Sequence, residues 1–221
     1  MMTKTKVLIV DDHRVVIEGI KSALSVSPDL EVIGEALNGH QAIKKSKSLK
    51  PDIVIMDISM PDLNGIDATL QIKKLDPRIK IIIFSMYSNR EYVIDLFKAG
   101  ISSYVLKKDP MSDLVSAIKA VERGGTYFTT ISSEILLNYV KELDDSNKNN
   151  NNINGFESLS LREREVFQLL SEGKPIKGIA ETLGISRKTV ETHKYNIMEK
   201  LHAKNITDLT KLAIKKGIIQ L

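Results

Sequence analysis

The sequence predicts an α/β domain built on a doubly wound parallel sheet, followed by an all-helical domain. Two patterns lead to this fold class. Over the first 125 residues, short apolar runs rich in Val and Ile alternate with amphipathic stretches, and from Ser158 onward the pattern is purely helical. Runs that are apolar throughout are typical of parallel strands covered on both faces. The strands should therefore form the middle layer, with the active end of the domain at their carboxyl edge.

Five strands and five helices are expected in the first domain. The predicted strands are residues 7–10, 30–33, 53–56, 81–84 and 104–106. The predicted helices lie near residues 14–25, 39–48, 64–74, 90–99 and 111–123. Gly124 and Gly125 supply the stop after the last of these helices.

The rest of the chain divides into a linker and a second domain. Residues 131–143 predict one more helix, whereas 144–155 read DDSNKNNNNING, offer almost nothing to bury and predict a flexible linker. Four further helices are expected near residues 161–172, 175–183, 187–201 and 206–216. The predicted domain boundaries are residues 4–125 for the α/β domain, 126–157 for a linker helix with the Asn-rich linker, and 158–221 for the helical domain.

Composition narrows the class of protein. Hydrophobic residues make up 42% of the chain and charged residues 27%, as in ordinary soluble proteins. There is no apolar run of about 18 residues, and the apolar stretch before Asp11 is too short for a signal peptide, so we expect a cytoplasmic protein with no membrane partner. The absence of cysteine excludes disulfides and thiolate metal sites.

The net charge of +4 is unevenly distributed. Residues 1–155 carry 20 basic and 20 acidic side chains, and residues 156–221 carry 12 and 8. The whole excess of positive charge therefore lies in the last third of the chain. This distribution favours nucleic-acid contact by the helical domain.

Acidic, hydroxyl and basic residues stand where the predicted strands end. Asp11 and Asp12 follow the first strand, Asp57 ends the third, Ser85 ends the fourth, and Lys107 follows the fifth. Three close carboxylates repel one another and call for a hard divalent cation such as Mg²⁺, and a lysine ammonium is suited to phosphate. A nucleophilic carboxylate, a metal ion, a hydroxyl and an ammonium together predict a phosphoryl-transfer site.

Other chemistries fit these residues less well. A haloacid-dehalogenase-type phosphatase also uses a strand-end aspartate, but it needs a second acid two residues on, where this chain has Ser59. A dinucleotide fold would place G-x-G-x-x-G after the first strand, where DDHR stands. His13 is an alternative metal ligand beside the acidic pair, although no second imidazole stands at metal-binding spacing.

The helical domain contains a helix-turn-helix pattern. Gly184 breaks the chain between two predicted helices, and Ser186 can cap the second of them. If Val190 and Ile197 face inward, the opposite face mixes one cation with hydrogen-bonding groups, as reading of a DNA groove requires. Periodicity also permits a small helical bundle that binds protein.

The segments VLIVDDH, DIVIMDISMPDLNGID, IIIFSMYS and GISSYVLKKD resemble the receiver domain of two-component response regulators. The resemblance spans about residues 5–125 and implies a flavodoxin-like fold with a five-stranded parallel sheet. It also implies that Asp57 accepts a phosphoryl group from a sensor histidine kinase and forms an acyl phosphate. By the same resemblance Asp12 and Asp57 ligate Mg²⁺ directly, Ser59 offers its backbone carbonyl, and Asp11 acts through water.

The resemblance implies three further roles in the receiver. Lys107 would pair with the phosphoryl group, and Ser85 would move to hydrogen-bond it. Tyr104 would be an aromatic switch that turns inward once Ser85 has moved. Ser85 replaces the more usual Thr, a variant that looks normal for the NarL/FixJ subfamily.

The segments LSLREREVFQLL and IKGIAETLGISRKTVETHKYNIMEKL resemble the LuxR-type DNA-binding domain of NarL/FixJ regulators. The resemblance covers residues 158–217 and implies that 187–201 is the recognition helix in the major groove. The last helix, with Leu209, Leu212 and Ala213, resembles the family's dimerisation surface. The side chains expected at DNA are Thr192, Tyr195 and Glu191 facing bases, and Lys188, Thr189 and Lys194 contacting phosphates.

Together the two resemblances imply a DNA-binding response regulator that controls transcription. Its expected partners are a cognate histidine kinase, double-stranded promoter DNA and a second copy of itself on DNA. We expect no enzymatic activity beyond its own phosphorylation and dephosphorylation. Two alternatives stay open: a pseudo-receiver transcription factor that ignores phosphorylation, and a signalling adaptor that does not bind DNA.

Overall fold

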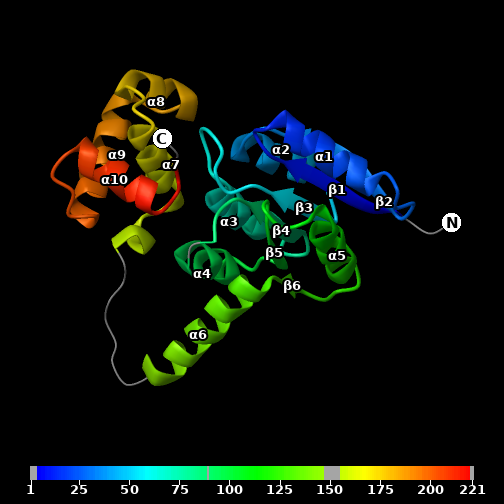
Figure 1. The fold of residues 1–221 in the computed structure, drawn as a ribbon. Helices are drawn as coiled ribbons and strands as arrows, with labels where there is room; N and C mark the ends of the chain where they lie inside the picture. Colours follow the sequence, from blue (N-terminus) through cyan, green and yellow to red (C-terminus); the bar gives the residue numbers. More distant parts are fainter. Residues whose placement is uncertain (1–3, 89, 147–154, 220–221) are drawn as a thin grey trace. The chain divides into compact units, whose positions relative to one another are not determined.

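The structure is a computed structural model that describes residues 4–88, 90–146 and 155–219 (Figure 1). The chain divides into two compact units, residues 1–146 and residues 147–221. The first unit is an α/β domain and the second is helical, so the predicted fold class is confirmed. No helix among the described residues is long and apolar enough to cross a membrane.

The first unit contains a parallel sheet whose strands are ordered β2-β1-β3-β4-β5-β6. The strands are β1 (Thr5–Val10), β2 (Leu30–Ala36), β3 (Ile53–Met56), β4 (Lys80–Ser85), β5 (Ser103–Leu106) and β6 (Tyr127–Phe128). The helices are α1 (Arg14–Leu24), α2 (Gly39–Leu49), α3 (Gly65–Leu75), α4 (Arg90–Lys98), α5 (Met111–Glu122) and α6 (Thr130–Ser146).

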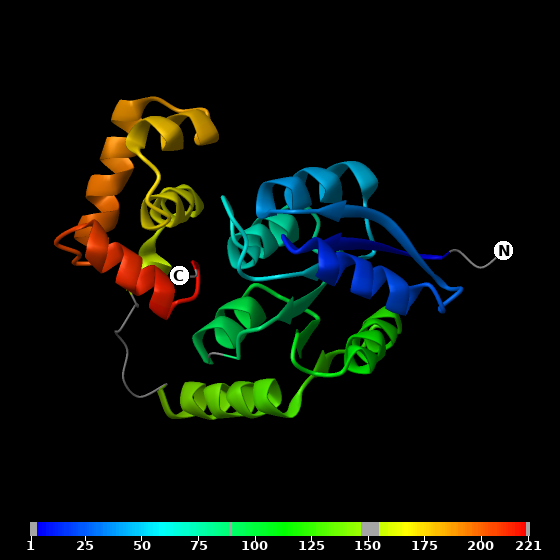
Figure 2. The ribbon, with the colours of Figure 1, turned by 45° about the horizontal axis from the view of Figure 1, so that its top comes forward.

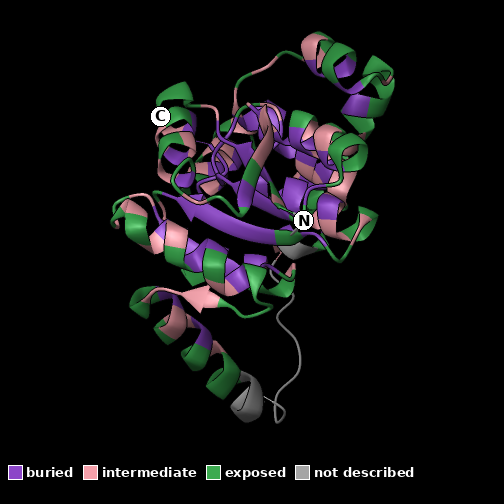
Figure 3. Ribbon diagram, turned by 90° about the vertical axis from the view of Figure 1, so that its right-hand side faces the viewer, coloured by how far each residue is buried: buried purple, intermediate pink, exposed green. Residues whose placement is uncertain are grey.

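Helices cover both faces of this sheet (Figure 2). Successive side chains of a strand point to opposite faces, which divides the core into two apolar clusters. Val7 and Ile9 pack in the cluster with α1 and α5, whereas Leu8 and Val10 pack in the cluster with α2, α3 and α4. β3 is therefore buried along its whole length, and β1 and β4 are buried from Val7 and Ile81 to their carboxyl ends, which explains why these stretches are apolar. Figure 3 shows buried strands between the helices.

The sheet has six strands, not the five predicted. β6 consists of two residues and pairs in parallel with the edge of β5. Its position is supported by Ser103, whose Oγ donates a hydrogen bond of 2.6 Å to the carbonyl oxygen of Tyr127. A strand of two half-buried residues is too short to leave an alternating or apolar pattern in the sequence, which explains why it was missed.

Helix α6 belongs to the first compact unit. It begins one residue before the predicted helix at 131 and runs on to Ser146. Leu136 is buried in the same apolar cluster as α4 and β5, so α6 packs as part of the α/β unit. Residues 147–154, the centre of the predicted Asn-rich linker, lie outside the described residues.

The second unit has a core enclosed by four α-helices. Its elements are a 3-10 helix η1 (Gly155–Ser158) and α7 (Leu161–Ser171), α8 (Ile176–Leu183), α9 (Arg187–Lys200) and α10 (Ile206–Lys215). Gly184 ends α8 in a left-handed conformation, with φ at 62°, where a residue without a side chain is favoured. Ser186 then caps α9 by accepting a hydrogen bond of 3.0 Å from the amide of Thr189. The predicted helix-turn-helix is thus formed by α8 and α9.

Candidate functional site

The carboxyl edge of the sheet brings the predicted site residues together. Val10 of β1 pairs with Met56 of β3, so the residues that follow them, Asp11 and Asp57, leave the sheet side by side. Ser85 ends β4, and Lys107 follows β5 directly. The ladder continues past the strands, because the amide of Asp57 donates to the carbonyl of Val10 at 2.9 Å. The strand pairing therefore explains why these side chains converge.

Lys107 joins two of the carboxylates. Its Nζ lies 2.7 Å from Oδ2 of Asp11 and 2.8 Å from Oδ2 of Asp57, and its side chain is 9% exposed. Burial would lower the pKa of Lys107, but the negative charges of Asp57 and Asp11 outweigh it, so the pKa is raised. The ammonium is therefore held in its charged form against Asp57.

Asp57 is 4% exposed and occupies an unusual electrostatic environment. Burial is the largest effect on this carboxyl and, together with the charge of Asp11, raises its pKa to about 6. The ammonium of Lys107 and the amide of Ile58, which donates to Oδ1 at 2.7 Å, act in the opposite direction. A cation bound beside Asp57 would also favour the ionised form.

A potential metal centre lies at the same place. Asp11, Asp12, His13 and Asp57 each offer one ligand atom, and these atoms lie within 4.8 Å of one another. The three carboxylates outnumber the single ammonium of Lys107, so the pocket carries excess negative charge. This donor set fits Mg²⁺, which is bound through carboxylate oxygens and keeps positions for water or phosphoryl oxygen.

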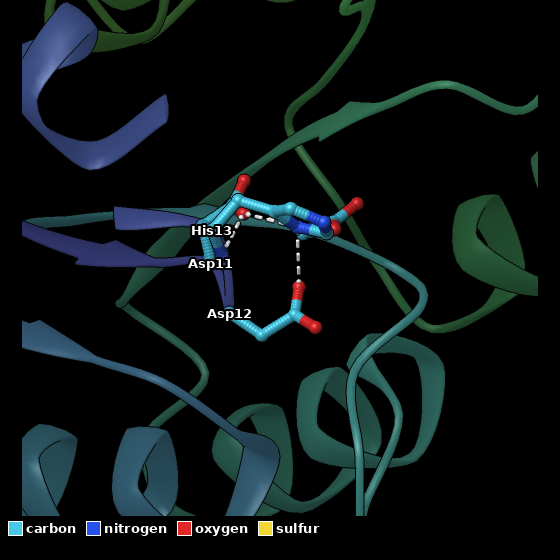
Figure 4. A group of neighbouring side chains, drawn as sticks. Asp11, Asp12 and His13 are labelled. Atoms are coloured by element: carbon cyan, nitrogen blue, oxygen red, sulfur yellow. Dashed lines mark hydrogen bonds and ion pairs between the residues drawn. The ribbon is translucent and has the colours of Figure 1, made fainter. Parts of the chain in front are cut away.

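His13 lies beside Asp11 and Asp12 (Figure 4) and is more exposed than either of them. Its Nδ1 is 2.8 Å from Oδ1 of Asp12 and 3.4 Å from Oδ1 of Asp11, and its side chain is 64% exposed. Its backbone amide donates to Oδ1 of Asp11 at 2.9 Å. His13 is the one imidazole in the group formed by the described residues. The alternative role as a ligand is thus compatible with the position of the ring, although carboxylates supply the other three donors.

The loop after β3 is shaped by Gly65. Its amide donates to the carbonyl of Ile58 at 2.7 Å, which closes the loop that contains the buried Ser59. A Cβ atom at position 65 would lie 1.9 Å from the carbonyl oxygen of Asp57, so a side chain cannot fit. Gly65 therefore permits the close turn that carries the predicted nucleophile.

Ser85 and Tyr104 are both fully buried and both contact Tyr87, in the loop after β4. The amide of Tyr87 donates to Oγ of Ser85 at 3.4 Å, and the hydroxyl of Tyr104 donates to the carbonyl oxygen of Tyr87 at 2.8 Å. The described arrangement therefore has Tyr104 turned inward. Sequence reasoning missed this connection, because the acceptor is a backbone carbonyl and leaves no trace in residue types.

Helix α9 presents the predicted DNA-facing side chains. Val190 and Ile197 are fully buried, and the opposite face is open, with Tyr195 69% exposed. The six predicted side chains lie outside the core: Lys188, Thr189, Glu191, Thr192 and Tyr195 are exposed, and Lys194 is half-buried. The hydroxyl of Thr192 donates to the carbonyl of Lys188 at 3.0 Å within the helix.

Two long-range contacts, which sequence reasoning did not identify, hold α9 and the turn before it. Lys200, the last residue of α9, places its Nζ 2.7 and 2.9 Å from the two carboxylate oxygens of Glu163 at the start of α7. Arg162 donates to Oε2 of Glu165 and to the carbonyl of Leu183, each at 2.6 Å. Lys200 and Glu163 are 37 residues apart in the sequence, and Arg162 and Leu183 are 21 residues apart. Local sequence patterns do not reveal contacts between residues so far apart.

Helix α10 differs from the expectation for a dimerisation surface. Leu209 and Ala213 are fully buried in the core of their own unit, and Leu212 is half-buried. Of the three residues predicted to lie on this surface, Leu209 and Ala213 are therefore core residues. Their spacing of four places them on the inward face of the helix.

Comparisons with known proteins agree with this geometry. Residues 7–119 match the response regulator receiver domain, and residues 157–213 match the bacterial regulatory proteins of the luxR family. The oxygen regulatory protein NreC of Staphylococcus carnosus is 38% identical over 215 residues, which are 97% of this chain and 99% of NreC. The transcriptional regulatory protein DegU of Brevibacillus brevis is 31% identical over 226 residues, 98% of this chain and 96% of DegU.

Solved structures of RcsB from Salmonella are also similar. RcsB from Salmonella enterica serovar Typhimurium, bound to a promoter in the presence of the phosphomimetic BeF3⁻, matches with a TM-score of 0.59 and 28% identity, over 95% of this chain and 97% of RcsB. Another structure contains two RcsB dimers bound to two parallel DNAs. The similarity thus extends over both units of the chain.

Proposed function

Since this chain belongs to the NarL/FixJ family of response regulators, in which a receiver domain and a LuxR-type DNA-binding domain control transcription within a two-component system, we propose that phosphorylation of Asp57 is the event that switches it. The observation that carries this proposal is the position of Lys107, whose ammonium contacts Asp57 and Asp11 at the carboxyl edge of the sheet. Such a charge is placed to receive the negative oxygens of a phosphoryl group.

The proposed reaction is transfer of a phosphoryl group from a phosphohistidine of the sensor kinase. A carboxylate oxygen of Asp57 attacks the phosphorus atom, an O–P bond forms, the N–P bond breaks, and the imidazole takes up a proton as it leaves. Lys107 holds the phosphoryl oxygens, and Ser85 moves to hydrogen-bond them. Mg²⁺, when bound by Asp11, Asp12, Asp57 and the backbone carbonyl of Ser59, would neutralise charge on the phosphoryl oxygens.

The proposed consequence is a shift between two populations of the receiver. Phosphate at Asp57 favours the population with Tyr104 turned inward, which leaves the recognition helix α9 available to DNA. In that helix Thr192, Tyr195 and Glu191 face the bases. We assign phosphate contacts to Lys188, Thr189 and Lys194.

We further propose that the chain binds promoter DNA as a homodimer on paired half-sites, as the dimers of RcsB on DNA suggest by similarity. Because a regulator of this kind must reach both its kinase and the chromosome, we place it in the cytoplasm. Its own phosphorylation and dephosphorylation would be its only catalysis. The domain boundaries 4–125, 126–157 and 158–221 remain our proposal, with β6 and α6 packed on the receiver.

Labelling of the full chain tests the phosphorylation site. With Mg²⁺ and acetyl phosphate, we expect one phosphoryl group per chain, detected as a single added mass. Asp57→Ala should take up none, whereas Asp52→Ala, at the opposite end of β3, should label as the wild type does. Unchanged labelling of Asp57→Ala would remove the assignment.

The two alternatives predict different results in the same experiment. A pseudo-receiver would bind DNA equally with and without the phosphodonor. An adaptor would show no DNA affinity that depends on salt. The buried contacts between Asp11, Asp57 and Lys107 argue against the first, and the match of residues 157–213 to the luxR family argues against the second.

A further inference from the structure

Three tyrosines lie close together next to Ser85 of the proposed phosphoryl-transfer site. Tyr87 follows β4, Tyr92 lies in the first turn of α4, and Tyr104 lies in β5. The rings of Tyr87 and Tyr92 meet edge to face, with 5.7 Å between centroids and an interplanar angle of 83°. Tyr104 donates its hydroxyl to the carbonyl oxygen of Tyr87 at 2.8 Å. Tyr87 is thus in contact with both of the other tyrosines and, through its amide, with Ser85.

The two buried phenols of this group differ in one respect. Tyr104 is fully buried and its hydroxyl is paired, whereas Tyr92 is 2% exposed and its hydroxyl has no hydrogen-bond partner among the described residues. Burial also raises the pKa of Tyr92, so the hydroxyl stays protonated and its proton needs an acceptor. An unpaired buried hydroxyl disfavours the arrangement that contains it by roughly 5- to 150-fold in population.

The position of Tyr92 links this cost to the orientation of Tyr104. When Tyr104 points inward, its hydroxyl donates a hydrogen bond to the carbonyl oxygen of Tyr87. The ring of Tyr92 packs edge to face against the ring of the same Tyr87. If Tyr104 turned away, this carbonyl would lose its donor, and the space that the phenol fills would open. Water or the freed carbonyl would then be available to the hydroxyl of Tyr92, and the cost of its missing partner would fall on the inward arrangement.

We propose that Tyr92 is a positioning residue of the phosphorylation switch: its unpaired hydroxyl disfavours the arrangement with Tyr104 inward and keeps that arrangement at low population until a phosphoryl group at Asp57 stabilises it. This inference rests on the proposed function, because it assigns the inward arrangement to the phosphorylated receiver. Phenylalanine at position 92 would keep the edge-to-face contact with Tyr87 and remove the cost.

Binding of beryllofluoride to the full chain in Mg²⁺ tests the inference. A ligand that binds one of two arrangements has an apparent affinity reduced by the fraction of chains in that arrangement. If Tyr92→Phe raises this fraction, its apparent affinity for beryllofluoride should be at least fivefold tighter than that of the wild type. Tyr104→Phe loses the existing bond to Tyr87 and should bind more weakly. Tyr139→Phe, on α6, keeps its ring contact with Lys98 and should bind within twofold of the wild type.

Fluorotyrosine NMR gives the second readout. The chain has six tyrosines, so 3-fluorotyrosine labelling yields six signals, and the signal absent from Tyr104→Phe identifies Tyr104. Before beryllofluoride is added, Tyr92→Phe should move the Tyr104 signal toward its bound position. An unchanged signal and affinity, or a Tyr92→Phe chain that is less stable to heat than the wild type, would overturn the inference. If the wild type itself ignores beryllofluoride, the proposed function fails, and this inference fails with it.

Discussion

Glu163 makes two kinds of contact at the start of α7, and replacing it by Gln removes one of them. Its carboxylate accepts a hydrogen bond of 2.8 Å from the amide of Ser160, which completes a capping box, and it also binds Lys200 at 2.7 Å. A Gln side chain can still accept from the amide of Ser160. The substitution therefore isolates the ion pair that ties α7 to the end of α9.

The expected loss follows from the exposure of the two side chains. Glu163 is 5% exposed and Lys200 is 38% exposed. Exposed ion pairs contribute about 0.2–1 kcal/mol, and breaking a buried pair costs about 3–5 kcal/mol. This half-buried pair should lie between these limits, and we predict that Glu163→Gln destabilises the second unit by about 1–2 kcal/mol at pH 7.

Hydrogen exchange of the α7 amides in the full chain measures this loss in the unit concerned. The matched control is Glu181→Gln, because Glu181 and Lys177 are 4.0 Å apart with side chains 69% and 66% exposed. This control should change the free energy of unfolding by less than about 0.5 kcal/mol. Equal protection of α7 in wild type and Glu163→Gln at pH 7 would refute the reasoning.

The pH dependence gives an independent check. Burial alone would raise the pKa of Glu163, but the hydrogen bonds from Lys200 and Ser160 outweigh it, and the pKa is lowered. A carboxyl whose pKa is lower in the folded chain stabilises it above its ordinary pKa of 4.5, and this contribution is lost as the pH falls through the lowered value. The difference between wild type and Glu163→Gln should therefore be full at pH 7 and shrink as the pH falls below 4.5 and through the lowered pKa of Glu163. A difference that persists in acid would assign the effect to packing.

Three further predictions concern the receiver and the DNA-binding helix. Without Mg²⁺, Asp57→Asn should be about 1–3 kcal/mol more stable than the wild type at pH 7. The reason is that the folded chain raises the pKa of Asp57 to about 6 and so opposes its ionisation. Urea unfolding should show that the difference in stability closes at about pH 4. Gly65→Ala should lower the stability of the fold by at least about 2 kcal/mol and abolish phosphorylation, since its Cβ would lie 1.9 Å from a backbone oxygen. As a control, Gly124→Ala should lower the stability by only about 1 kcal/mol, because no atom lies within 4 Å of its Cβ although φ is 81°. Lys188→Ala should weaken binding to all DNA sequences alike and lower the salt slope by about one, and a loss confined to certain base positions would show that Lys188 reads bases.

The elements that were predicted correctly are those with a strong local pattern. β1, β3 and β4 are apolar runs because both faces of the sheet are covered, and the site at their carboxyl ends follows from their parallel direction. β6 was missed because its two residues are held by a neighbour, Ser103, and not by a pattern of their own. The pattern of α10 was recognised as helical, but Leu209 and Ala213 were assigned to a surface although the core of the unit buries them.

Residue types along the chain were sufficient to predict which side chains gather at the carboxyl edge of the sheet: an aspartate at the end of a buried strand, further carboxylates and a lysine. The pKa values and the orientations of the side chains at this site depend on neighbours that are distant in the chain. The raised pKa of Asp57 arises because the sheet buries it beside Asp11, and the orientation of Tyr104 depends on the backbone carbonyl of Tyr87. Burial and backbone acceptors are properties of the folded chain, so no reading of residue types could supply them.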